Sequence, residues 1–280
     1  MLAAARRTPP QLYFIVSAVF HYLGPAFAVL LFARVDVLGV AWLRIASAAA
    51  VFALWRRPWR AWAAQDADAK RLLATWGAVL AVMNACFYLA IDRLPLGTVA
   101  AIEFLGVIVL AAVGVRSARN GMALALAVGG VYVLTDVQLA GEPLGLAFAF
   151  ANAVLFALYI VLAHRVAQRV ESVDGLGAAM LIALVAVTPL AGWAAAPAVG
   201  DPVALAAGIG VGVCSSVIPY VCDQLAMARL SRATYALLVS LLPATATLIG
   251  LIVLTQVPSP AEVAGVALVV VGVALHEGSE

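Results

Sequence analysis

The sequence predicts an all-α integral membrane protein with ten transmembrane helices arranged as two inverted five-helix repeats. Three observations carry this prediction: the composition, the distribution of arginine and lysine between apolar runs, and a similarity of the chain to itself. Of the 280 residues, 66% are hydrophobic and only 11% are charged, whereas soluble domains carry about 25% charged residues. A chain this apolar requires a lipid bilayer as part of its surroundings.

Ten apolar runs lie between charged or turn-rich breaks, and each is a candidate span because a membrane helix needs about 20 apolar residues. The spans are expected at residues 11–33, 37–55, 72–91, 96–115, 121–135, 144–162, 175–195, 203–226, 233–254 and 261–275. The fifth and tenth are short, so their ends are expected to reach the headgroup region. The first run follows Arg6 and Arg7 like a signal peptide, but it continues through Phe32 and is long enough to span.

The positively charged residues orient these spans. With ten spans, one side of the membrane receives 13 of the 16 arginine and lysine residues, and the other receives only Arg34 and Arg93. Arg44 is left inside a span. Because an excess of arginine and lysine marks cytoplasmic loops, both termini are predicted to be cytoplasmic.

The chain resembles itself at a shift of 136 residues. Residues 86–105 and 222–241 agree at eight of 20 positions, including Arg93 with Arg229. Shared apolar composition explains the matching leucines and alanines, but it explains the matching arginine less easily. We therefore predict a first five-helix repeat at 1–140 and a second at 141–280. Five is odd, so the second repeat is inverted in the membrane, which is a signature of secondary transporters.

Four polar side chains are predicted to share one layer within the membrane. Glu103 interrupts the apolar run AAIEFLGVIVL at 100–110. At 1.5 Å per residue, Glu103, Arg44 and Asn84 lie roughly 10 Å below the outer face, and Asn152 lies roughly 12 Å below it. Ionisable residues in a span are expensive and usually face the bundle interior or a watery cavity. This layer is the candidate substrate-binding site.

The chemistry of the layer suits a zwitterion. Arg44 can bind a carboxylate through a bidentate fork, Glu103 can bind an ammonium group, and Asn84 and Asn152 can donate or accept hydrogen bonds. Two alternatives stay open. Arg44 and Glu103 can pair with each other and pin two helices, or Glu103 can be a proton site whose pKa is raised by burial, which would make protons the coupling ion.

Aromatic and acidic residues complete the candidate site. Tyr88 and Tyr159 are expected to line the substrate region, although aromatic residues in helices more often serve packing than binding. Tyr220 and Asp223 lie toward the cytoplasmic end of the eighth span, as a candidate inner gate. Four prolines are expected to interrupt spans: Pro25, Pro189, Pro219 and Pro243.

Other classes of function lack their sequence signals. The three histidines are scattered, and neither an H-E-x-x-H motif nor a phosphate-binding G-x-x-x-x-G-K loop occurs. The three cysteines show no metal-binding spacing. The net charge of +2 is too small to indicate a nucleic-acid-binding surface. We therefore expect no enzyme, no cofactor, no metal and no nucleic-acid partner. The expected partners are a small-molecule substrate and the lipid bilayer, with the oligomeric state left open.

Several segments resemble a known family. The runs MNACFYLAIDRLPLGTVAAIEFLG (83–106) and IPYVCDQLAMARLSRATYALLVSLLPA (218–244), together with Leu43-Arg44 and RRPWR (56–60), are similar to the amino-acid exporter branch of the drug/metabolite transporter superfamily, which is built from EamA-type repeats. The resemblance implies a ten-helix basket in the bacterial inner membrane that exports amino acids by alternating access. Efflux of drugs or other small metabolites by the same fold is the alternative.

By position, the resemblance assigns motif roles to Arg44, Asn84, Tyr88, Glu103, Pro219, Tyr220 and Asp223. Two positions depart from the family pattern. Val107 stands where the family often has a proline, and Thr255-Gln256 stands where it often has a glycine-glutamate pair. The second departure puts in doubt any role for an acid at that mouth. An aromatic-lined cavity with few fixed charges would tolerate many side chains, so threonine-like and aromatic amino acids both remain candidates.

Overall fold

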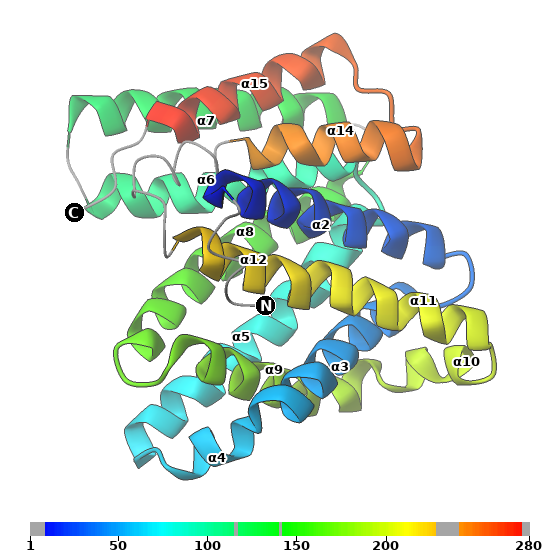
Figure 1. Cartoon of the computed structure of the whole chain (residues 1–280). Coiled ribbons are helices and arrows are strands. Elements are labelled where there is room, and N and C mark those ends of the chain that lie inside the picture. Colours follow the sequence, from blue (N-terminus) through cyan, green and yellow to red (C-terminus); the bar gives the residue numbers. More distant parts are fainter. Residues whose placement is uncertain (1–8, 115–116, 140–141, 228–240, 276–280) are drawn as a thin grey trace. The chain divides into compact units, whose positions relative to one another are not determined.

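The computed structural model describes residues 9–114, 117–139, 142–227 and 241–275, and within these ranges every regular element is helical (Figure 1). The longer helices are α2 (Pro10–Leu31), α3 (Val37–Arg56), α5 (Ala67–Ile91), α6 (Leu96–Gly114), α7 (Ala118–Leu139), α8 (Pro143–Ala167), α9 (Ser172–Ala191), α11 (Pro202–Gly212), α12 (Ile218–Met227), α14 (Leu242–Leu254) and α15 (Pro260–Leu275). Short elements are α4 (Pro58–Ala63), the 3-10 turn η1 (Trp193–Ala195), α10 (Ala196–Val199) and the π turn η2 (Val213–Val217).

Six of these helical stretches are long and apolar enough to cross a membrane. They are Gln11–Leu31, Val37–Arg56, Ala67–Ile91, Pro143–Ala167, Val173–Ala191 and Pro202–Cys222. Shorter apolar helices occupy Leu96–Gly106, Ala118–Leu134, Leu242–Leu254 and Pro260–Leu275. The all-helical membrane class is therefore confirmed. A span count of ten and the inverted repeat remain predictions, and residues 233–240 of the ninth expected span lie outside the described ranges.

Helix α5 begins five residues before the apolar run that predicted it. Asp66 caps the helix, with its Oδ1 accepting a hydrogen bond from the Ala69 amide at 2.7 Å. Asp68 in the first turn adds a favourable interaction with the helix dipole. Hydropathy detects only the segment that needs lipid, whereas capping decides where the helix begins.

The described chain forms two compact units, and each draws on both halves of the sequence. Unit 1 comprises residues 1–26, 95–140 and 214–280, and unit 2 comprises residues 27–94 and 141–213. In unit 1, α15 lies along α7 and also packs on α6 (Figure 1). In unit 2, α5 packs against α8 and α9, and α3 packs against α9 and α11. The repeats predicted at 1–140 and 141–280 concern internal symmetry, which this division does not test.

Within unit 2, α3 is joined to α9 near both ends. Trp42 Nε1 donates to Thr188 Oγ1 at 2.9 Å. Arg56 Nε donates to Asp174 Oδ1 at 2.7 Å, and Arg56 Nη2 donates to Glu171 Oε1 at 2.8 Å. These contacts hold the helix that carries Arg44.

The eighth expected span is helical from Pro202 through Cys222 but contains a π turn. The π turn η2 lies between α11 and α12 and ends two residues before Pro219. Proline has no amide hydrogen and its ring clashes with the carbonyl four residues earlier, here that of Ser215. The wider π turn accommodates this clash, and π turns of this kind are frequent at functional sites. Pro243, in contrast, lies in the first turn of α14, where a proline removes no helical hydrogen bond.

Asp201 in unit 2 carries a testable pH dependence. Its Oδ1 accepts from the amides of Val203 and Ala204 at the start of α11, and its Oδ2 pairs with Arg34 Nη1 at 3.0 Å. The hydrogen bond from Ala204, followed by that from Arg34, lowers the pKa of Asp201 below its ordinary value. A lowered folded-state pKa means that the stabilisation is present above the unfolded pKa of about 3.9 and is lost as the pH falls through the folded pKa.

We therefore expect Asp201→Ala to lower the melting temperature in detergent at pH 7, with a gap from wild type that narrows as the pH falls below about 4. Asp201→Asn keeps a neutral capping oxygen, so the difference in melting temperature between the asparagine and alanine variants should not depend on pH. Thermal unfolding of the three proteins at several pH values measures both differences in melting temperature. If the difference between wild type and Asp201→Ala stayed constant through this pH range, the ionisation of Asp201 would not contribute to stability as described.

Candidate functional site

Arg44 and Tyr88 meet in the interior of unit 2. The Arg44 Cζ atom lies 5.5 Å from the centroid of the Tyr88 ring, which is the geometry of a cation–π contact. Arg44 is 9% exposed and Tyr88 is fully buried. Phe32 and Phe87 pack against the Tyr88 ring with centroid distances of 6.1 and 5.9 Å. The guanidinium group is thus held against an aromatic face rather than extended into lipid.

The packing of α5 against α8 determines the relative positions of Asn84 and Asn152 along the two helices. Trp76 of α5 contacts Tyr159 of α8 with ring centroids 5.5 Å apart. From that contact, Asn84 is eight residues forward along α5 and Asn152 is seven residues back along α8. In antiparallel helices, these are steps of about 12 and about 10 Å in the same direction. Asn84 and Asn152 therefore lie at nearly the same height along these two helices.

Both asparagines are buried, at 4% and 1% exposure. Asn84 Nδ2 donates to the Leu80 carbonyl of its own helix at 2.8 Å. That bond uses one of the two amide hydrogens, so the carbonyl oxygen and the second hydrogen can serve a ligand. Tyr88 is one helical turn from Asn84, a rise of about 6 Å. Within unit 2, Arg44 therefore contacts Tyr88, and a single site that also includes Asn84 and Asn152 stays a prediction.

A second aromatic group lies about two turns away along α8. Tyr159 stacks on Phe156 with a centroid distance of 6.1 Å and an interplanar angle of 6°, and Trp76 packs against Tyr159. Trp76 is 4% exposed, and its Nε1 has no hydrogen-bond partner within the described ranges. Sequence reasoning missed Trp76. Trp76 lies eight residues before Asn84 on α5, about two helical turns away, and no spacing pattern in the sequence marked it.

Glu103 lies in unit 1, on α6, and is 7% exposed. The same unit contains Tyr22 of α2. Tyr22 is 1% exposed, and its hydroxyl has no hydrogen-bond partner in the described part of the chain. That Glu103 and Arg44 form one binding site stays a prediction, because the two residues belong to different units.

The two candidate gate residues also lie in unit 1, on α12. Tyr220 is half-buried, and the side chain of Asp223 is outside the described part of the structure. Ser17 Oγ of α2 donates to the Pro219 carbonyl at 3.2 Å, which joins α2 to the start of α12. A gating role for Tyr220 and Asp223 remains a prediction.

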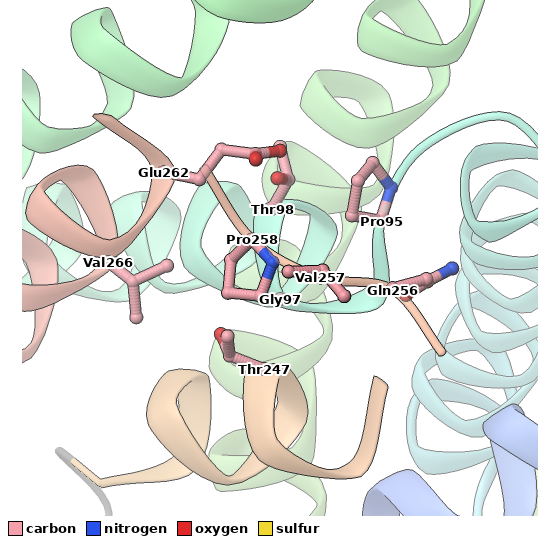
Figure 2. Close-up of a pocket in the computed structure, with 9 residues that line it drawn as sticks. All are labelled: Pro95, Gly97, Thr98, Thr247, Gln256, Val257, Pro258, Glu262 and Val266. Carbon is pink, nitrogen blue, oxygen red and sulfur yellow. The ribbon is translucent and has the colours of Figure 1, made fainter. Parts of the chain in front are cut away.

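Unit 1 also contains a cavity of about 170 Å³ where α6 begins, α14 ends and α15 begins (Figure 2). Gln256 Oε1 accepts a hydrogen bond from the Leu96 amide at 3.1 Å and so caps α6. Ser259 and Glu262 form a reciprocal capping box at the start of α15, with bonds of 2.8 and 3.2 Å. Gln256 stands at a position that departs from the family pattern, and its neutral side chain caps the start of α6.

Among the described residues, no three His, Cys, Asp or Glu side chains come together. The site features found among them are hydrogen-bonding groups, an aromatic-stacked guanidinium and buried carboxylates.

Comparison with known proteins finds relatives that match most of the chain. The chain is 30% identical over 267 residues to the threonine/homoserine exporter RhtA of Salmonella typhimurium (strain LT2), covering 91% of this chain and 88% of that protein. It is 29% identical over 255 residues to RhtA of Escherichia coli (strain K12), covering 88% of this chain and 84% of that protein. A solved crystal structure with 18% identity aligns over 95% of both chains with a TM-score of 0.56, which shows a similarity of fold.

The family model described as EamA-like transporter family matches residues 143–276. This range falls within the second predicted repeat. The matching relatives are exporters rather than enzymes. With six apolar helices long enough to span, the chain is a multi-pass membrane protein, and it belongs to the EamA-like family of drug/metabolite transporters.

Proposed function

We propose that this protein is a secondary transporter that exports small amino acids of the threonine and homoserine type across the bacterial inner membrane. The observation that carries the proposal is 30% identity over 91% of the chain to a named threonine/homoserine exporter. The similarity extends along nearly the whole chain, so it includes the helices that carry Arg44, Asn84, Tyr88 and Asn152. Aromatic amino acids are further candidate substrates.

The proposed recognition uses the two charges of the substrate separately. The substrate carboxylate binds the Arg44 guanidinium, which the Tyr88 ring orients from one face. Asn84 and Asn152 hydrogen-bond the same end of the substrate. Glu103 binds the ammonium group. In the absence of substrate, Arg44 and Glu103 can pair with each other, and substrate binding then replaces that pair.

The proposed architecture is ten spans in two inverted repeats with both termini in the cytoplasm. Helices occupy the expected positions of the spans within the described ranges, and the charge distribution along the sequence supports the orientation. Alternating access follows from two similar halves of opposite orientation, each able to adopt the conformation of the other. Tyr220 and Asp223 close the cytoplasmic mouth in this proposal.

Efflux of drugs or cationic metabolites is the second candidate function. The stacked Phe156 and Tyr159 rings beside Trp76 favour it, because aromatic faces attract cations without requiring a carboxylate. A quaternary amine lacks the carboxylate that Arg44 would bind. Transport of such an amine at a rate similar to that of threonine would therefore favour this second function.

Counterflow in proteoliposomes tests the proposal. Liposomes loaded with unlabelled threonine should accumulate labelled threonine and homoserine, and the same panel should include aromatic amino acids and a quaternary amine. Empty liposomes are the control. Repeating the assay at two pH values tests proton coupling, since a proton-coupled exporter depends on the proton gradient and a facilitator does not. No counterflow with any amino acid would contradict the proposed function.

A further inference from the structure

We propose that the cleft between α4 and α9 in unit 2 binds an anionic phospholipid, with the headgroup beside Arg57 and Arg60 and one acyl chain along α9. The proposal concerns a partner in the membrane and does not depend on which solute the protein exports. The cleft has a volume of about 290 Å³. Its lining residues are all apolar or aromatic: Pro58, Trp59, Trp62, Ala178, Leu181, Ile182 and Val185.

Helix α4 is held beside α9 at the end of a candidate span. It follows directly after α3, which forms the span Val37–Arg56 (Figure 1). Pro58, the first residue of α4, is buried. On α9, Gly177 leaves room for this proline, because a Cβ atom at Gly177 would lie only 3.3 Å from Pro58 Cβ. Helix α4 therefore lies where the hydrocarbon of the bilayer meets the headgroups.

The α9 wall of the cleft has the course of an acyl chain. Its four residues, at positions 178, 181, 182 and 185, follow the spacing of one helical face. From the first to the last the helix rises about 10 Å, which is about two-thirds of the ~15 Å depth of one leaflet. Val185, at the far end, is 74% exposed. The wall therefore runs from the start of α9 into the hydrocarbon layer.

Two tryptophans form much of the α4 wall. Trp59 and Trp62 are three residues apart, so they lie on the same side of the short helix. Trp59 is 52% exposed. Tryptophan is enriched at the boundary between hydrocarbon and headgroups, because its ring is apolar and its indole N–H is polar. These residues place the α4 end of the cleft at the level of a lipid headgroup.

Two arginines beside this end have charge available for a headgroup. Arg57 caps the start of α4 and Arg60 lies in its first turn, so both are close in sequence to the lining residues. Both are exposed, and neither forms an ion pair with another described residue. Arg56, in contrast, pairs with Asp174 and Glu171 of the α9 region. A lipid with a net negative headgroup complements Arg57 and Arg60 better than a zwitterionic one.

The test measures the half-saturation concentration for dioleoyl-phosphatidylglycerol by native mass spectrometry of the full chain in detergent. Arg57 has a left-handed backbone, with φ 51° and ψ 55°. Glycine adopts this conformation readily, so Arg57→Gly removes the guanidinium without straining the turn. Arg60→Gln keeps a residue of good helix propensity. Each variant should raise the half-saturation concentration about 5-fold, and the double variant about 25-fold.

Arg71→Gln is the matched control. Arg71 is also an exposed arginine, with a side chain that is 82% exposed, but it lies on α5 and does not line the cleft. Its variant should bind phosphatidylglycerol as wild type does. Melting temperatures of all four variants without added lipid check the fold, and a variant that unfolds is replaced by lysine at the same position, which should keep the binding.

Two further ligands separate the headgroup from the acyl chain. Dioleoyl-phosphatidylcholine has the same chains without the net charge and should bind wild type at least about 5-fold more weakly. Glycerol 3-phosphate has the anionic group without the chains and should not compete. Equal binding of the two lipids, an equal loss in Arg71→Gln, or competition by glycerol 3-phosphate would each overturn the proposed lipid site.

Discussion

Arg44→Ala and Glu103→Gln are each expected to abolish amino-acid transport while leaving a folded protein in detergent. Both residues are more than nine-tenths buried, and a charge at membrane depth is costly without a partner or a function. Hydrogen bonds to charged groups contribute about 1.5–3 kcal/mol each. Loss of a bidentate contact from Arg44 should therefore lower the transport rate at subsaturating substrate by at least about 100-fold. Proteoliposome counterflow measures the rate, and size-exclusion chromatography checks the fold.

Two matched variants separate charge from geometry at Arg44. Arg44→Lys keeps the charge but loses the planar fork and part of the contact with Tyr88, so it should retain partial activity. Tyr88→Phe keeps the aromatic face that lies 5.5 Å from Arg44 Cζ and should reduce transport less than Tyr88→Leu. Full uptake by both Arg44→Ala and Glu103→Gln would refute the site assignment.

Gly212→Ala is expected to destabilise the protein strongly, whereas Gly210→Ala in the same helix should not. A Cβ atom on Gly212 would overlap Ser47 Oγ and lie 2.6 Å from the Arg44 carbonyl oxygen. The backbone oxygen cannot turn aside, so α11 must move away from α3 at the turn that carries Arg44. Overpacking of this kind costs about 1–3 kcal/mol. The displaced turn should also reduce transport.

Gly210 is the internal control, because a Cβ atom there has no heavy atom within 4 Å. Alanine at that position adds helix propensity of about 0.5–1 kcal/mol without a clash. Melting temperatures of the two variants in detergent should therefore move in opposite directions from wild type. Equal melting temperatures for the two variants would show that α11 and α3 are not in the close contact described here.

Much of the secondary structure was predictable because it is encoded locally. Apolar runs located helices over each expected span within the described ranges, and capping residues such as Asp66 and Asp201 account for helix starts. An irregularity in the eighth span near Pro219 was predictable in the same way, since the loss of one amide hydrogen is a local effect. The exact form of this irregularity, a π turn, was not predictable, because other local distortions also accommodate a proline.

The candidate site was less predictable because the spans are apolar on nearly every face. In water, an amphipathic pattern shows which face is buried, but lipid is as apolar as a protein interior and removes this contrast. Depth along a helix therefore followed from counting residues, as for Asn84 and Asn152. Counting residues does not show which face of a helix points inward. The contact of Trp76 with Tyr159 and the cap of α6 by Gln256 were therefore missed.

The sequence by itself determined the membrane class, the helices and the family, because hydropathy, capping and motif residues act over short stretches of chain. Only the tertiary structure decided that Arg44 lies on Tyr88, that α11 approaches α3 through Gly212, and that Thr98 and Glu262 line one cavity. These contacts join residues between 44 and 168 positions apart. Such contacts depend on how side chains of different helices fit together, and no local pattern along the chain records that fit.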